Sequence, residues 1–152
     1  MEEKSGYSGI GRGGALYIRG GELLHKEYEE IEEYIAEMKE AVSADRYRIE
    51  RNKKRQANSD LYREYVIDEA KSKDILMNLT VHDFCETVRN EHLGYEHELL
   101  YVFGKDVRLL QRFGAEEEVV SLYIKCNKLE NRFVIIISFH RQAYPLTYAF
   151  KP

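Results

Sequence analysis

Residues 121–142 read SLYIKCNKLENRFVIIISFHRQ, and this stretch decides the fold. Two runs in this region, 119–126 and 133–139, are rich in β-branched and aromatic residues, and the polar residues KLEN lie between them. Apolar runs of this length, separated by a short polar segment, are typical of two strands joined by a turn. The stretch therefore predicts an antiparallel hairpin whose second strand crosses the core.

The register of this hairpin decides which side chains share a face of the sheet. Successive side chains of a strand point to opposite faces, so a loop of two or four residues groups the polar side chains, and a three-residue loop breaks the grouping. The polar residues that share a face in the first case are Tyr123, Lys125, Ser138 and His140. The opposite face, expected to lie in the core, carries Phe133, Ile135, Ile137 and Phe139.

Further β-rich runs surround this hairpin. They read HELLYVFG, VRLLQRF and VVSLYIKC, and the turn-forming segments GKD and GAEEE separate them. This alternation of strands and turns predicts an antiparallel meander after residue 91. The tail AYPLTYAF could add an edge strand, because Pro145 is tolerated only at an edge.

Residues 22–43 are expected to form one helix. Their apolar side chains recur at intervals of three and four, which marks one buried helix face. These residues are Leu24, Tyr28, Ile31, Ile35, Met38 and Val42. The segment RYRIE at 46–50 then indicates a short strand.

Two short helices and a turn are expected before the meander. Ser59 could cap the first helix, and a second helix runs through residues 74–79. Thr80 could cap a further turn over residues 81–86. The apolar face of the first of these helices carries Leu61, Tyr65 and Ile67.

The predicted fold class is α+β, with N-terminal helices packed on one side of a C-terminal antiparallel sheet. Residues 22–152 are expected to form a single domain. Residues 1–21 hold seven of the ten glycines, which predicts a flexible leader. The leader contains GIGRGG, a formal match to G-x-G-x-x-G. No strand precedes it, so a dinucleotide site is not expected there.

Composition places the protein among soluble cytoplasmic domains. With 152 residues and 43% apolar residues, the chain can bury a core without a metal or a disulfide. Cys85 and Cys126 lie far apart and form no C-x-x-C motif, which favours a reducing compartment and no zinc site. The longest apolar run, 133–137, is too short to span a membrane. No metal and no cofactor are expected.

The net charge of −4 is unevenly distributed. Residues 22–43 hold eight acidic residues against two lysines, and the segment DRYRIERNKKRQ at 45–56 is strongly basic. A basic cluster of this kind attracts phosphate, although a solvated turn gives the same pattern. The predicted RNA-binding residues are Arg46, Arg48, Arg51, Lys53, Lys54, Arg55 and, after the last strand, Arg141.

Three segments resemble the MqsR family of toxin ribonucleases, which have a RelE-type fold. They are EMKEAVSADRYRIERN, DILMNLTVHDFCET and the hairpin SLYIKCNKLENRFVIIISFHRQ, and they occur in the family's order. The resemblance covers about residues 35–142. It implies metal-independent cleavage of mRNA and inhibition by a partner antitoxin.

The resemblance carries over only in part to the residues that would act. Tyr123 matches the tyrosine of the family's hairpin. His140 stands where the family has a lysine after Ser-Phe, and Glu86 stands where it has another lysine. The family's glutamine position falls near Tyr101.

The residues themselves point to acid–base chemistry on RNA. Metal-independent cleavage needs a group that takes the 2′-hydroxyl proton, a group that stabilises the phosphate, and a group that protonates the leaving oxygen. His140 is the expected proton-transfer residue, because imidazole exchanges protons near neutral pH. Lys125 is expected to stabilise the phosphate, with Arg141 or Arg112, and Tyr123 to orient the substrate. Each could instead serve packing or solvation.

A second group of acid–base residues lies in NEHLGYEHELLY at 90–101. Its H-x-x-x-x-H spacing does not place two histidines on one helix face, so a metal site is not expected. Either Glu98 or His97 is the expected catalytic partner of His140.

Two functions follow from these observations. The first is the toxin of a type II toxin–antitoxin system, an mRNA endoribonuclease that binds a cognate antitoxin and acts in the cytoplasm. The alternative is a non-catalytic MqsR-like module that binds a protein partner through its acidic helix and sheet edge. Either form could be a homodimer or a toxin–antitoxin complex.

Overall fold

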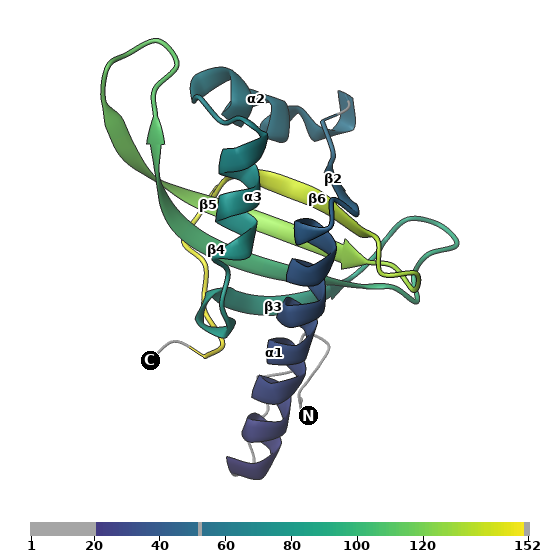
Figure 1. The fold of residues 1–152 in the computed structure, drawn as a ribbon. Helices are drawn as coiled ribbons and strands as arrows, with labels where there is room; N and C mark the ends of the chain where they lie inside the picture. The colour runs from purple at the N-terminus through teal and green to yellow at the C-terminus, as the bar shows by residue number, and fades with distance from the viewer. Residues whose placement is uncertain (1–20, 52, 151–152) are drawn as a thin grey trace.

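A computed structural model describes residues 21–51 and 53–150, with side chains from residue 27 onward except at Lys53. The expected leader at residues 1–20, with its GIGRGG segment, lies outside the described residues. In the described part of the chain, three α-helices cover one face of a five-stranded sheet, which confirms the α+β class (Figure 1). None of these helices combines the length and the apolar character that a membrane-spanning segment needs.

One short strand lies among the helices before the meander. The helices are α1 (Gly21–Ser43), α2 (Gln56–Glu64) and α3 (Glu69–Met77), with short 3-10 turns η2 (Lys53–Arg55) and η3 (Val81–Asp83). The strands are β2 (Tyr47–Ile49), β3 (Phe84–Arg89), β4 (Leu99–Leu110), β5 (Glu117–Lys128) and β6 (Val134–Arg141). The sheet order is β2-β6-β5-β4-β3. Strands β3 to β6 form an antiparallel meander, as predicted, but it begins at Phe84 and not after residue 91, and the runs HELLYVFG and VRLLQRF form one strand, β4. Strand β2 adds a parallel edge beside β6.

Helix α1 uses its predicted apolar face to cover the sheet. Ile31, Ile35, Met38 and Val42 are all buried, as their spacing indicated. Tyr34 joins them and stacks on Tyr101 of β4 with ring centroids 3.7 Å apart. The acidic side chains that lie exposed on α1 are Glu29, Glu30, Glu32, Glu33 and Glu40. The acidity of this segment thus belongs to the solvent side of an amphipathic helix.

The expected turn at GKD is wrong, because residues 104–106 continue β4 and pair with β5. Gly104 is there for close packing. A Cβ atom at this position would lie 2.7 Å from Cδ1 of Leu146 and 2.5 Å from the hydroxyl oxygen of Tyr148. Because Gly104 has no side chain, the C-terminal tail can pack against the sheet at this position.

The region of α2 and α3 differs from the expected pattern. Ser59 lies inside α2 and does not cap it, and its hydroxyl donates to the Arg51 carbonyl. The chain leaves the helix at Tyr65 because the N–H of Val66 bonds to the Leu110 carbonyl at the end of β4. Helix α3 begins earlier than expected, and Asp68 caps it by accepting from the N–H of Lys71.

Thr80 caps a turn as expected, but the turn is shorter than predicted. The N–H of Thr80 donates to the Asp83 carboxylate at 2.8 Å, and strand β3 starts at the next residue, Phe84. The expected helical conformation through Glu86 is therefore wrong. Pairing of Phe84 with Phe103 of β4 takes precedence over the local turn signal.

The tail after β6 crosses the sheet face opposite the helices and does not form the expected edge strand. Gln142 donates from its side chain to the Leu122 carbonyl, and the N–H of Ala149 bonds to the Phe84 carbonyl at the sheet edge. Phe150 then packs edge-on against Tyr28 of α1. The tail covers one end of this sheet face.

Both cysteines are free and buried. Burial raises the pKa of the Cys126 thiol to about 12, so the reactive thiolate is scarce near neutrality. We expect Cys126 to resist alkylation at pH 8 in the folded protein and to react once urea unfolds it. Mass spectrometry of alkylated peptides checks this, with Cys126→Ala as the control. Rapid labelling of native Cys126 would show that the helix layer opens readily.

Candidate functional site

The sheet face turned away from the helices carries the polar residues of the predicted site. We call it the open face. Cross-strand pairing places these residues on it: Glu86, Val102, Gly104, Tyr123, Lys125, Ser138 and His140. The tail packs over Gly104, and the region around Lys125 remains accessible as a groove.

The predicted grouping of polar residues is confirmed, but by a different route. His140 lies opposite Tyr123, and Ser138 lies opposite Lys125. The connection between the strands has five residues, 129–133, which alone would break the grouping. An irregularity in pairing between β5 and β6, where Ile137 is the extra residue, shifts the register by one and restores it.

The same bulge makes the predicted core face partly wrong. Phe133, Ile135 and Ile137 are only half-buried. The residues of this segment that are fully buried are Val134, Ile136 and Phe139. On the loop side of the bulge the even-numbered residues face the helices, and beyond it the odd-numbered residues do.

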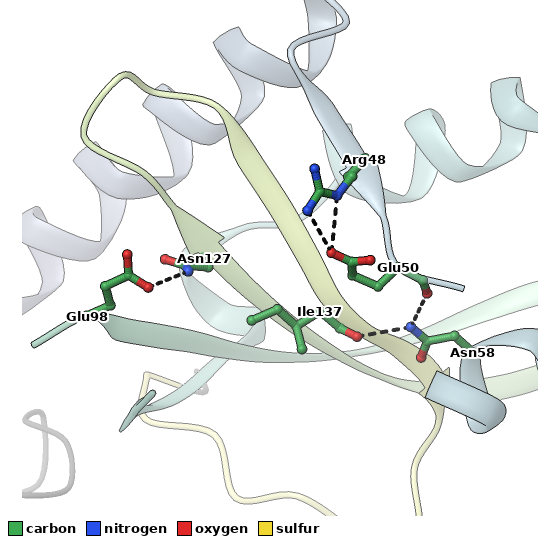
Figure 2. A network of polar contacts seen from close by, with 6 residues as sticks. All are labelled: Arg48, Glu50, Asn58, Glu98, Asn127 and Ile137. Atoms are coloured by element: carbon green, nitrogen blue, oxygen red, sulfur yellow. Dashed lines mark hydrogen bonds and ion pairs between the residues drawn. The ribbon is translucent and has the colours of Figure 1, made fainter. Parts of the chain in front are cut away.

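Asn58 of α2 holds this bulge in place (Figure 2). Its amide Nδ2 donates to the carbonyls of Glu50 and Ile137 at 2.6 and 3.0 Å. Its Oδ1 accepts from the N–H of Phe139 at 2.9 Å. Asn58 is completely buried, so these backbone groups would otherwise have no partner in this part of the fold. One asparagine thereby joins α2, the end of β2 and the irregular part of β6.

Tyr123 and His140 form a stacked pair. Their ring centroids are 5.3 Å apart and their planes differ by 9°. Nδ1 of His140 lies 2.8 Å from the Arg141 carbonyl oxygen, which can only accept a hydrogen bond, so Nδ1 carries the proton. In the neutral ring Nε2 is then the basic nitrogen. Burial, and next the charge of Glu86, raise the pKa of Tyr123, so its hydroxyl keeps its proton.

A groove of about 520 Å³ opens beside this pair. Its lining comes from strands β3, β4, β5 and β6, from η2 and from the segment that follows β3. The residues that line it are Arg55, Val88, Arg89, Asn90, Glu91, His92, Leu100, Tyr123, Lys125 and Ile137. We call it the cationic groove, because three arginine or lysine side chains line it against one carboxylate.

Lys125 lines the cationic groove on β5. Burial, and next the nearby Arg55, lower the pKa of its ammonium group, while Glu91 acts in the opposite direction. Partial burial and a second positive charge nearby both disfavour the charged form of Lys125, and the negative charge of a bound phosphate would offset both effects. The groove can therefore hold an anion between Lys125 and Arg55.

The predicted basic segment does not form one surface. Of its described side chains, Arg55 alone lines the cationic groove. Arg48 pairs with Glu50 at 3.0 Å, and the guanidinium of Arg51 lies 4.1 Å from the ring centroid of Tyr62. Those two side chains line a separate pocket next to α3. Arg46 and Lys54 are exposed, and the side chain of Lys53 lies outside the described residues.

Arg141 is also directed away from the cationic groove. It pairs with Glu64 at 3.0 Å and donates to the hydroxyl of Tyr65 at 2.9 Å. Arg112 donates to the carbonyls of Tyr62 and Tyr65 and plays a structural part at the end of α2. The expected contribution of both arginines to the site is therefore not supported by their positions.

His97 and Glu98 do not line the cationic groove, and no contact joins them to His140 in the described part of the chain, so their expected role as its partners gains no support. They line a neighbouring pocket with Lys128 and the β5–β6 connection. The Glu98 carboxylate accepts from the side-chain amide of Asn127 at 2.9 Å (Figure 2). It also accepts from the side-chain amide of Asn90 at 3.0 Å. This carboxylate ties the segment after β3 to β5, which is a structural task.

The segment NEHLGYEHELLY contains the dipeptide Glu-His twice, and the structure brings the first copy to the site. Glu91 and His92 line the cationic groove with Arg89. Spacing alone does not distinguish the two copies. The repeated Glu-His was the one signal in the sequence that could have found these residues. Arg89 had no such signal.

No cluster of three or more His, Cys, Asp or Glu side chains able to hold a metal ion occurs among the residues that the structure describes. The chemistry available at the cationic groove is that of imidazole, ammonium, guanidinium and phenol groups. These can bind a phosphate and exchange protons with it.

No protein family, curated protein or solved structure matches this chain in sequence or fold searches.

Proposed function

We propose that the protein is the toxin of a type II toxin–antitoxin system and cleaves mRNA without a metal. Its fold would be of the RelE type, as in the MqsR family that its sequence resembles. The observation that carries the proposal is the cationic groove, where Lys125 and Arg55 lie beside a stacked tyrosine and histidine. Positive charge next to an acid–base group is what RNA cleavage requires.

In this mechanism the scissile phosphate binds between Lys125 and Arg55. Nε2 of His140 takes the proton of the 2′-hydroxyl, and the 2′-oxygen attacks phosphorus. Lys125 and Arg55 stabilise the negative charge that gathers on the phosphate oxygens. Tyr123 holds the imidazole by stacking, and the Arg141 carbonyl holds its tautomer. The products are a 2′,3′-cyclic phosphate and a 5′-hydroxyl.

Lys125→Ala tests the electrostatic part of this mechanism. Removing a positive group from the reacting phosphate is expected to lower the cleavage rate by about a hundredfold. Cleavage of labelled single-stranded RNA in EDTA measures the effect, with and without ribosomes. Lys71→Ala on α3 is the control, because it removes the same charge outside the cationic groove. The proposal fails if wild-type protein leaves RNA intact in both settings.

The partners follow from this activity. An mRNA strand would lie along the cationic groove, and a cognate antitoxin would cover the toxin in the cytoplasm. The exposed acidic side of α1 offers charge for such a contact. A homodimer is the other assembly that we consider.

The alternative function is a non-catalytic MqsR-like module that binds a protein partner. Glu86 favours it, because this carboxylate lies on the open face near Tyr123, where the resemblance places a lysine. A negative charge there opposes the binding of phosphate. Intact RNA after incubation with both wild type and Glu86→Lys would favour this alternative.

A further inference from the structure

Cleavage of RNA leaves one chemical task that the residues above do not perform. When the bond between phosphorus and the 5′-oxygen breaks, that oxygen must receive a proton or leave as an unstable alkoxide. His140 takes a proton in the same step and cannot also give one. The donor must therefore be a second group beside the cationic groove.

We infer that His92 is the residue that protonates the leaving 5′-oxygen, an inference that rests on the proposed function. His92 lines the cationic groove together with Tyr123 and Lys125. It reaches the groove from the segment that follows β3, whereas Arg55 reaches it from η2. His140 does not line the groove itself and lies next to it, stacked on the groove residue Tyr123. A phosphate bound at Lys125 would thus share the groove with the His92 imidazole, and His140 would act from its position beside Tyr123.

The segment that carries His92 is held by hydrogen bonds at both ends. The N–H of Asn90 donates to the Glu98 carbonyl, and its side-chain amide donates to the Glu98 carboxylate, each at 3.0 Å. The same carboxylate accepts from Asn127 of β5 (Figure 2). These hydrogen bonds among Asn90, Glu98 and Asn127 hold the two ends of the segment against the sheet. Glu98 therefore supports the site without touching the substrate.

His92 itself has fixed backbone contacts within this segment. Its N–H donates to Oδ1 of Asn90 at 3.0 Å, and its carbonyl accepts from the N–H of Tyr95 at 2.9 Å. The rings of His92 and Tyr95 lie 6.1 Å apart and are tilted by 51°. A catalytic side chain needs this kind of support, because a displacement of about 1 Å costs much of the rate.

The protons and bonds balance over one turnover. The proton of the 2′-hydroxyl passes to His140, and the bond from the 2′-oxygen to phosphorus forms. The bond from phosphorus to the 5′-oxygen breaks, and this oxygen takes the proton of the His92 imidazolium. One histidine gains a proton and the other loses one, and water then restores both.

Glu91 is the neighbouring group that could compete for this role. It also lines the cationic groove, and its charge acts on Lys125. Carboxylates as a class are ionised near neutral pH and have no proton to give. An imidazolium is the better donor to an alkoxide at that pH.

A substrate with a sulfur leaving group distinguishes a loss of proton donation by His92 from a loss of any other function of this residue. In a 5′-phosphorothiolate linkage the leaving atom is sulfur, and a thiolate leaves without needing a proton. With the natural oxygen substrate, we expect His92→Ala to lower the single-turnover cleavage rate by about a hundredfold or more. With the sulfur substrate, its rate should return to within a few-fold of the wild-type rate. His140→Ala should stay slow with both.

His97→Ala is the matched control, because it removes the second histidine of the same segment outside the cationic groove. The inference is overturned if His92→Ala cleaves the oxygen substrate as fast as His97→Ala does. It is also overturned if the defect is equal with both substrates, or if Glu91→Gln is the variant that sulfur rescues. Wild-type protein that cleaves neither substrate refutes the proposed function itself, an outcome distinct from these three.

Discussion

Replacing His140 with alanine is expected to lower the rate of RNA cleavage by about a hundred- to ten-thousand-fold, the usual cost of losing a general base. The fold should survive, because the side chain is only half-buried and its hydrogen bond goes to the adjacent carbonyl of Arg141. Cleavage of labelled RNA and thermal unfolding, measured on the same preparations, check both parts.

His82→Ala is a close control for this prediction. Nδ1 of His82 also lies next to a backbone carbonyl, that of Phe150, at 2.6 Å, but its ring contacts Tyr28 of α1 and not the groove residue Tyr123. His140→Lys tests the residue that the family resemblance places here. A stable His140→Ala variant that cleaves at nearly the wild-type rate would show that His140 serves packing against Tyr123.

Replacing Asn58 is expected to have the largest effect on stability. Asn58→Ala leaves the carbonyls of Glu50 and Ile137 and the N–H of Phe139 without their partner. Each buried group left unpaired costs about 1–3 kcal/mol, so the loss should be about 3 kcal/mol or more. For a chain of this size that lowers the melting temperature by roughly 10 °C. Urea unfolding measures the free energy directly.

Two further variants make this prediction specific. Asn58→Asp keeps the shape and the acceptor but removes both N–H donors and buries a carboxylate, so it should destabilise at least as much as alanine. Gln56→Ala removes an exposed side chain of the same helix, which donates to Asp60, and it should change little. A loss below about 1 kcal/mol for both Asn58 variants would mean that water replaces the amide at the bulge.

Local sequence patterns predicted the helices and strands that depend on residues close together in the sequence. The spacing of Ile31, Ile35, Met38 and Val42 describes one face of a helix, and that face is buried against the sheet. The apolar runs in 119–139 predicted a hairpin, and β5 and β6 form one. When one side of a helix or strand is buried, apolar residues recur in the sequence with the period of that element, so the element can be predicted from the spacing.

Other predictions failed where a distant contact outweighed the local signal. Gly104 looked like a turn residue, but it makes room for Leu146 and Tyr148 of the tail. The helical turn expected through Glu86 gave way to pairing of Phe84 with Phe103. In each case the competing contact lies many residues away, and no short window of sequence contains both partners.

The sequence by itself determined the α+β class and the antiparallel hairpin of β5 and β6. The shared face of Tyr123, Lys125, Ser138 and His140 needed the bulge as well. Only the tertiary structure decided the bulge at Ile137, because it depends on Asn58, a residue 79 positions away. It also decided that Arg55 and the first Glu-His pair reach Lys125, while Arg48, Arg51 and the second pair do not. The physical reason is that a site forms where segments distant in sequence meet, and that meeting depends on packing of the whole chain.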